Sequence, residues 1–474
     1  MTASLSLPDE MSAEPDRSIT VVNPATGETV DEVGVTDREQ AHMIAARVAA
    51  AGRRWAATPA AERSERLRTA AGVLEAHADE LAALTTAESG KLLGDARGGV
   101  MAGVGALRQY AELGTVHRGR TLHGDRGALD VMINTPRGLA AVIVPWNDPV
   151  AIAMQGAAAN LAVGNAVLVK PSERAPLAVA RAVELLASEL PADVVRVVQG
   201  DGGTGWALVE DPAVRVVMHT GSVGTGRRIG ERCGALMKKA VLELGGKDAC
   251  VVDEGVDVAW AADQVALGAF ANAGQICVAI ERVLVHVAVG GPFVVALAER
   301  ARDLKVGDPT DPETQVGPLV DAAQVRWVDQ HVQDARRAGA ETLAGGEPLP
   351  GPGCFYPPTV LTGVHRGMAV LRQETFGPVA PVQLVESFRE GLDAANATPF
   401  GLAAVVLTPS MAHAHEAIRE LQVGTVKVNA AFGGAPGGAA HPHKASGQGF
   451  GYGPELLDEL TQVRVAHLEA PPPR

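Results

Sequence analysis

Aromatic residues are scarce in this sequence. Phenylalanine, tryptophan and tyrosine make up 3% of its 474 residues, whereas hydrophobic residues of all kinds make up 47%. Buried cores must therefore be packed mainly from alanine, valine and leucine. At roughly 150 residues per domain the length suggests about three units, and a chain of this size needs no disulfide or metal staples.

Cysteine is also rare. The four cysteines are far apart and form no Cys-x-x-Cys pair: Cys233, Cys250, Cys277 and Cys354. This spacing excludes a disulfide framework, and we expect a reducing location, the cytoplasm. The polar, acidic start of the sequence lacks the basic residues and the apolar stretch of a secretion signal.

Positive charge is in deficit, with 41 lysines and arginines against 55 aspartates and glutamates, a net charge of −14. This balance argues against nucleic acid or an anionic membrane as the main partner. It leaves room for a phosphate-bearing cofactor, because backbone N–H groups at a helix N-terminus can hold a phosphate.

Long uncharged runs are almost absent, and only Val150 to Val169 is long enough to cross a bilayer. This run is rich in alanine and glycine and contains Gln155, Asn160 and Asn165, so it provides little insertion energy. We predict a buried helix over about 149–162, a Gly-Asn turn and a buried strand over Ala166–Lys170. No membrane partner is expected.

Helical periodicity dominates residues 41–113, and short apolar strands then alternate with helices from Gly138 onward. A second alternating series begins after Gly245. Strands that alternate with helices form parallel sheets covered on both faces. The sequence therefore predicts an α/β fold with two α/β domains.

Two glycine motifs follow predicted strands and open predicted helices. The first, Gly200 to Gly205, fits G-x-G-x-x-G but lacks the acidic residue expected about 20 positions later, so it either contacts a cofactor or only makes a tight turn. The second contains Gly221 and Ser222, whose N–H groups and hydroxyl can bind an anion at a helix start or simply cap that helix.

Cys277 lies at a glycine-marked junction, in the sequence Gly274-Gln-Ile-Cys277. A single cysteine is most often a small buried hydrophobic residue. Two further junctions carry complementary groups, the carboxylate of Glu243 and the side-chain amide of Asn147. A thiolate nucleophile, a base and an oxyanion donor together indicate covalent acyl transfer.

Six motifs resemble those of the NAD(P)-dependent aldehyde dehydrogenases in order and spacing. They are PWN at 145–147, KPSE at 170–173, TGS at 220–222, ELGGK at 243–247, GQIC at 274–277 and ETFGP at 374–378. The resemblance runs from about residue 20 to about 467. It implies a Rossmann-type cofactor domain, an α/β catalytic domain and a small β oligomerisation arm.

The resemblance also implies catalytic roles. Cys277 is expected to attack the aldehyde carbon, and Asn147 with the N–H of Cys277 to hold the oxyanion. Hydride transfer to the nicotinamide then leaves a thioester, which water activated by Glu243 hydrolyses. Because a free thiol has a pKa of about 8.5, we expect the site to favour the thiolate.

Cofactor contacts follow from the same resemblance. The implied residues are Trp146, Lys170, Glu173, Gly221, Ser222, Glu374 and Phe376. A carboxylate at Glu173 can accept hydrogen bonds from the ribose hydroxyls of NAD and would repel the 2′-phosphate of NADP, so NAD is the expected cofactor.

The sequence departs from the family at two positions that line the aldehyde tunnel in relatives, where Asp148 and Gln155 replace aromatic residues. Polar residues there suggest an amino-, hydroxy- or semialdehyde substrate, but Asp148 could equally cap the helix that it precedes. Ile276 and Val278, which flank the nucleophile, are further expected tunnel residues.

A second departure covers Gly433–Gly451, where Phe450 and Gly451 replace an Arg-Glu pair. His441 and His443 lie in this loop, but they lack the further ligands of a metal site, and no metal is expected.

The resemblance implies a cofactor-binding domain at 1–117 and 137–245, a catalytic domain at 246–445, and a bridging element at 118–136 and 446–474. The last would pair subunits into a homodimer or homotetramer. Two alternatives stay open: a coenzyme A-acylating enzyme, which the base Glu243 disfavours, and a catalytically silent member.

Overall fold

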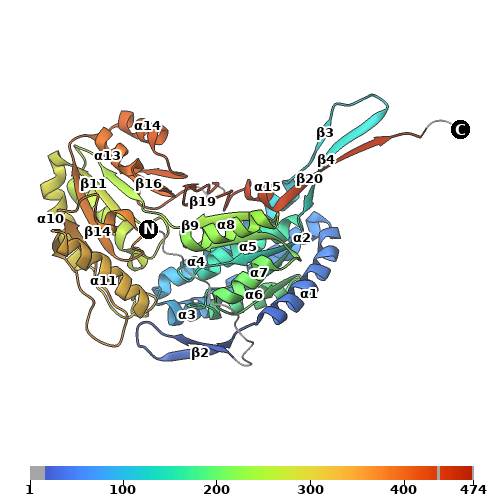
Figure 1. Cartoon of the computed structure of the whole chain (residues 1–474), viewed down its shortest axis with the longest axis horizontal. Helices are drawn as coiled ribbons and strands as arrows, with labels where there is room; N and C mark the ends of the chain where they lie inside the picture. Colours follow the sequence, from blue (N-terminus) through green and yellow to red (C-terminus); the bar gives the residue numbers. More distant parts are fainter. Residues whose placement is uncertain (1–16, 435–437, 472–474) are drawn as a thin grey trace.

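Two α/β units lie side by side in the computed structural model, and a long β arm projects from one of them (Figure 1). The structure describes residues 17–434 and 438–471. The predicted α/β class is confirmed. Part of the Gly433–Gly451 loop and both ends of the chain lie outside the described residues.

The first unit is built on a six-stranded sheet in the order β19-β9-β8-β5-β6-β7. Five strands are parallel, and β19 pairs antiparallel with β9. The strands are β5 (Leu139–Ile143), β6 (Ala166–Lys170), β7 (Val195–Val197), β8 (Val214–Gly221), β9 (Lys239–Leu244) and β19 (Gly447–Gln448). Taken in chain order, the parallel strands have the 3-2-1-4-5 arrangement of a dinucleotide-binding sheet, which reverses direction beside β5.

Eight helices belong to this unit: α1 (Arg38–Ala57), α2 (Ala60–Ala76), α3 (Ala78–Ser89), α4 (Leu93–Val116), α5 (Pro149–Val163), α6 (Leu177–Ser188), α7 (Gly202–Glu210) and α8 (Val223–Ala235). The hairpin of β1 (Ser18–Val22) and β2 (Thr29–Gly34) precedes them. The uncharged run thus forms the buried helix α5 and the strand β6, as predicted. No helix among the described residues is long and apolar enough to cross a membrane.

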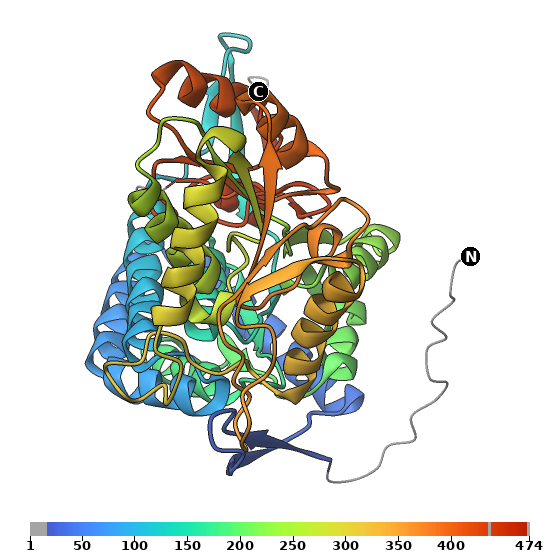
Figure 2. The ribbon, with the colours of Figure 1, turned by 90° about the vertical axis from the view of Figure 1, so that its left-hand side faces the viewer.

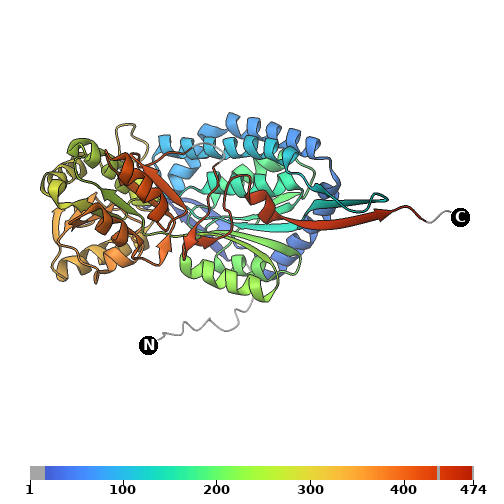
Figure 3. The same ribbon diagram turned by 90° about the horizontal axis from the view of Figure 1, so that it is seen from above.

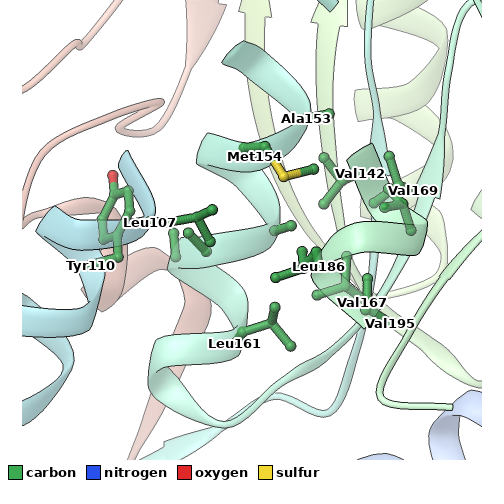
Figure 4. Close-up of a cluster of buried hydrophobic side chains, with 14 of the residues drawn as sticks. Leu107, Tyr110, Val142, Ala153, Met154, Leu161, Val167, Val169, Leu186 and Val195 are labelled. Carbon is green, nitrogen blue, oxygen red and sulfur yellow. The ribbon is translucent and has the colours of Figure 1, made fainter. Parts of the chain in front are cut away.

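Small residues let α5 approach its neighbours closely. A Cβ on Gly156 would lie 2.7 Å from Val142 of β5, and one on Gly103 of α4 would lie 3.2 Å from Met154. Figure 4 shows Met154 and Leu161 of α5 packed with Leu107, Val142 and Leu186 in the resulting core. Close backbone packing takes the place of the missing aromatic volume.

The second unit, in front in Figure 2, has a seven-stranded sheet in the order β12-β13-β14-β11-β10-β16-β17. Its strands are β10 (Ala249–Val252), β11 (Arg282–His286), β12 (Glu341–Ala344), β13 (Thr359–Thr362), β14 (Val379–Val385), β16 (Ala403–Leu407) and β17 (Thr425–Val428). All pairs are parallel except β12 with β13.

The helices of this unit are α9 (Val258–Phe270), η1 (Ala271–Gly274), α10 (Val287–Asp303), α11 (Ala322–Arg337), α12 (Ala369–Arg372), α13 (Phe388–Asn396) and α14 (Met411–Glu420). Two short strands, β15 (Phe400–Gly401) and β18 (His443–Lys444), pair beside it.

The arm is a three-stranded antiparallel sheet of β3 (Arg120–Leu122), β4 (Ala128–Pro136) and β20 (Thr461–Glu469), and it extends well beyond the body of the molecule (Figure 3). Residues 446–460 do not belong to it, contrary to the expected boundary. β19 joins the first sheet, and α15 (Leu456–Leu460) packs into the first core because its three leucines are apolar and buried.

Candidate active site

A cleft of about 2010 Å³ opens at the carboxyl ends of β5, β6, β8 and β9 and reaches the second unit. Parallel strands present their following loops at this edge, where open α/β sheets bind ligands. Ten of the predicted residues line the cleft: Trp146, Asn147, Lys170, Glu173, Gly221, Ser222, Glu243, Cys277, Glu374 and Phe376. Asp148, Gln155, Ile276 and Val278 are not among the lining residues.

The loop that carries Cys277 has an unusual backbone. Asn272, Ala273 and Gly274 have φ angles of 50°, 53° and 70°, in the left-handed region. A Cβ on Gly274 would lie 2.2 Å from the carbonyl oxygen of Gly377, so the ETFGP segment packs directly on this loop. Such strain persists only where the surroundings hold it.

Asn147 follows β5 and faces the same loop. Its Nδ2 donates to the carbonyl oxygen of Gln275 at 3.0 Å, and Asn147 is buried. This bond fixes the amide beside Cys277 and uses one of its two N–H groups.

In the protein on its own, the surroundings of Cys277 shift its pKa upward, away from the expected thiolate. Burial, together with the carboxylates of Glu243, Asp248 and Glu374, raises the pKa of Cys277 to about 12. The N–H of Val278 bonds the sulfur and only partly opposes this shift. Negative neighbours favour the neutral thiol.

Glu243 is the penultimate residue of β9, and its carboxyl group is buried against Gly451. Burial raises its pKa to about 8. A carboxyl group with a pKa near the working pH is suited to exchange a proton.

Glu374 and Phe376 come from the ETFGP segment. Burial and nearby Glu281 raise the pKa of Glu374 to about 8, and its Oε1 accepts from the N–H of Gly246 at 3.1 Å. Phe376 has a φ of 51° and meets Trp146 edge-on, with ring centroids 5.4 Å apart.

The residues that hold this segment were not predicted. The carboxylate of Glu281 accepts from the N–H groups of Thr375 and Phe376, both at 2.8 Å, and pairs with buried Lys247. Gln324 donates to the carbonyl oxygen of Phe376 at 2.9 Å. Lys247 lay within a recognised motif, but Glu281 and Gln324 carried no local sequence signal.

The other half of the cleft fits a dinucleotide. Lys170 is buried, which lowers its pKa, and its Nζ lies 3.4 Å from Oε2 of Glu173. Ser222 caps α8 by accepting from the N–H of Thr225, and Asp201 caps α7. A helix N-terminus and a buried lysine provide the donors that a pyrophosphate needs.

The Gly200 turn also lines the cleft, together with two tryptophans that were not predicted, Trp206 and Trp327. Trp327 donates through Nε1 to the carbonyl oxygen of Glu374 at 3.1 Å.

Asp148 and Gln155 make contacts of their own. Asp148 stands at the N-cap position of α5, but its side chain makes no capping bond, so the capping alternative is wrong. It pairs with Lys91 instead, at 2.7 Å from Nζ, and its side chain is 38% exposed. Gln155 donates through Nε2 to the carbonyl oxygen of Gly451 at 2.7 Å.

His441 and His443 lie with their rings 5.7 Å apart. Over residues 17–434 and 438–471, no group of three or more His, Cys, Asp or Glu side chains could hold a metal ion.

The strand order and the cleft define a dinucleotide-binding α/β protein. The sequence profile of the aldehyde dehydrogenase family matches residues 11–466. The chain therefore belongs to the aldehyde dehydrogenase family, and it is an NAD(P)-dependent oxidoreductase that oxidises an aldehyde.

Individual relatives and solved structures support this family assignment. A betaine aldehyde dehydrogenase of Cereibacter sphaeroides is 38% identical over 460 residues, covering 95% of this chain and 93% of the relative. The crystal structure of betaine aldehyde dehydrogenase from Staphylococcus aureus in complex with NAD+ has a TM-score of 0.93 at 27% identity, over 95% of this chain and 91% of that one. An NADP-dependent enzyme of E. coli has a TM-score of 0.93 at 31% identity, over 96% and 95%.

Proposed function

We propose that Cys277 is the nucleophile of this enzyme, with Asn147 and the N–H of Cys277 as oxyanion donors. The observation that carries the proposal is the convergence of Cys277, Asn147 and Glu243 on one cleft from separate elements of both units. When bound, NAD supplies the acceptor for the hydride.

Cys277→Ala tests this proposal. The variant should lose NADH formation by at least about 100-fold, because no other group can form the covalent adduct, while it still binds NAD. Full activity in Cys277→Ala would refute the role of Cys277.

Hydrolysis is the proposed fate of the thioester. A water molecule gives a proton to the carboxylate of Glu243, its oxygen bonds the acyl carbon, and the carbon–sulfur bond breaks to release a carboxylic acid and the Cys277 sulfur. Glu243 supports this route over transfer to coenzyme A, which requires water to be excluded. The intact set of three residues also disfavours a catalytically silent protein.

We expect NAD to be preferred over NADP because the carboxylate of Glu173 lies on the cleft beside Lys170, with 47% of its side chain exposed. Glu173→Gln removes this charge and should raise kcat/KM for NADP about tenfold, since a like-charge contact costs at least ~1.4 kcal/mol. Steady-state kinetics with both cofactors measures the ratio, and a wild-type preference for NADP would contradict the assignment.

The proposed substrate is a polar aldehyde that carries an amino, hydroxyl or second carbonyl-derived group. Relatives that are named for betaine aldehyde support this choice. Asp148 adds a partly exposed carboxylate next to Asn147, although it is paired with Lys91 and does not line the cleft. Gln155 adds less support than expected because its amide is bound to Gly451. Screening NADH formation over aliphatic, amino- and semialdehydes, with Asp148→Asn and the control Asp303→Asn at the end of α10 in the second unit, tests the assignment.

A homodimer or homotetramer is the proposed assembly, formed through the arm. Apolar side chains are exposed on β4 and β20, among them Leu129, Ile133 and Val465. A cytoplasmic location is also proposed, since all four cysteines are free and a reducing compartment keeps Cys277 usable.

A further inference from the structure

Gly451 touches the side chain of Glu243 without carrying one of its own. A Cβ built on Gly451 would lie 1.9 Å from Oε1 of Glu243 and 2.3 Å from both Cδ and Cγ. The φ of Gly451 is not positive, so an alanine could adopt the same backbone. The absence of the side chain, and not a special conformation, is what this position provides.

Three side chains from α4 and α5 hold this segment, two through its backbone and one through the side chain of Tyr452. Gln155 donates to the carbonyl oxygen of Gly451 at 2.7 Å, and Tyr110 donates to that of Gly453 at 3.3 Å. The hydroxyl of Tyr452 bonds Gln109, and its ring meets that of Tyr110 edge-on at 6.0 Å.

The opposite side of Gly451 is held as well. Its N–H donates to the carbonyl oxygen of Ala440 at 2.9 Å, and Ala440 forms an antiparallel bridge with Tyr452. The backbone under the Glu243 carboxyl group therefore cannot retreat when a side chain is added. The carboxyl group is the flexible partner, and it would have to move.

We propose that Gly451 and Gln155 are positioning residues for Glu243. Gln155 fixes the Gly451 peptide, and the bare Cα of Gly451 leaves the space in which the Glu243 carboxyl group is seated within reach of the acyl group on Cys277. The inference rests on the proposed role of Glu243 in thioester hydrolysis. It assigns to hydrolysis, and not to acylation, two residues that lie outside the nucleophile loop.

An activated ester separates the two steps without any cofactor. With p-nitrophenyl acetate, the Cys277 sulfur bonds the acetyl carbon and nitrophenolate leaves in a burst; water then releases acetate and frees the sulfur. Gly451→Ala should keep a burst of one nitrophenolate per site at a rate within about threefold of wild type, while the later steady rate falls about tenfold, part of the 100- to 10,000-fold that a general base contributes.

Gln155→Met keeps the side-chain volume but removes the donor, and it should lower the steady rate in the same way by a smaller factor. Gly105→Ala, at a glycine of α4 with nothing near its Cβ position, is the matched control and should behave as wild type. If Gly451→Ala does not fold, Gln155→Met decides the question.

Two reference variants distinguish the possible failures. Glu243→Gln should show a full burst and a slow steady rate; if it behaves as wild type, the proposed role of Glu243 has failed. If Glu243→Gln slows the steady rate but Gly451→Ala and Gln155→Met hydrolyse as fast as wild type, only the positioning role of Gly451 and Gln155 is refuted. If Gly451→Ala or Gln155→Met loses the burst and the steady rate equally, the positioning role is also overturned, since that pattern indicates general disruption of the active site.

Discussion

At the scale of single residues, the cleft holds acids whose protons are retained near neutral pH. Glu243 and Glu374 both have pKa values raised to about 8, and Cys277 has one raised to about 12. Burial disfavours each charged form, and the carboxylates of Glu243 and Glu374 further raise the pKa of Cys277 because like charges repel. A positive charge brought into the cleft would lower the pKa of Cys277 and favour its thiolate.

The pKa of Glu243 predicts the pH dependence of hydrolysis. The carboxylate is the form proposed to act as base, and it is present above pH 8 and lost as the pH falls below this value. The steady rate of p-nitrophenyl acetate hydrolysis should rise with pH and reach half its maximum near pH 8. Glu243→Gln should flatten this rise, and an unchanged profile in the variant would assign it to another group.

At the scale of elements, the Cys277 loop depends on one glycine. Gly274 has a φ of 70° and no room for a side chain beside Gly377. Gly274→Ala should lower the free energy of unfolding by about 1–3 kcal/mol, because strain and overlap add at this position. Denaturant unfolding measures the loss, with Gly105→Ala as control.

Most elements that build the site could be predicted from local sequence patterns. The strands β5 to β11 and the helix α5 follow from apolar runs bounded by glycine and proline. Seven of the ten site residues on the cleft lie in motifs at the ends of such strands, and the other three lie in motifs that precede β11 or β14. Glu281 and Gln155 act through contacts with residues about 95 and 296 positions away, and no local pattern carries that information. The acidity of Cys277 depends on three carboxylates that only the fold brings together.

At the scale of the whole molecule, the arm exposes apolar side chains that a single chain does not cover. Val465 is 62% exposed in the middle of β20, opposite Met132 of β4. Val465→Asp should shift the assembly toward monomers because it would bury a charge in the proposed interface. Sedimentation velocity measures the shift; an unchanged assembly would place the interface elsewhere. Arg419→Asp, on the helix α14, is the control.

The tryptophans of this protein are distributed unevenly. Trp146, Trp206 and Trp327, three of the five in the sequence, line the cleft, whereas Trp55 is buried in the first core. Most of the tryptophans therefore lie on the cleft that is proposed to bind the cofactor. Quenching of their emission gives a label-free titration of cofactor affinity, and it applies equally to variants that no longer turn over.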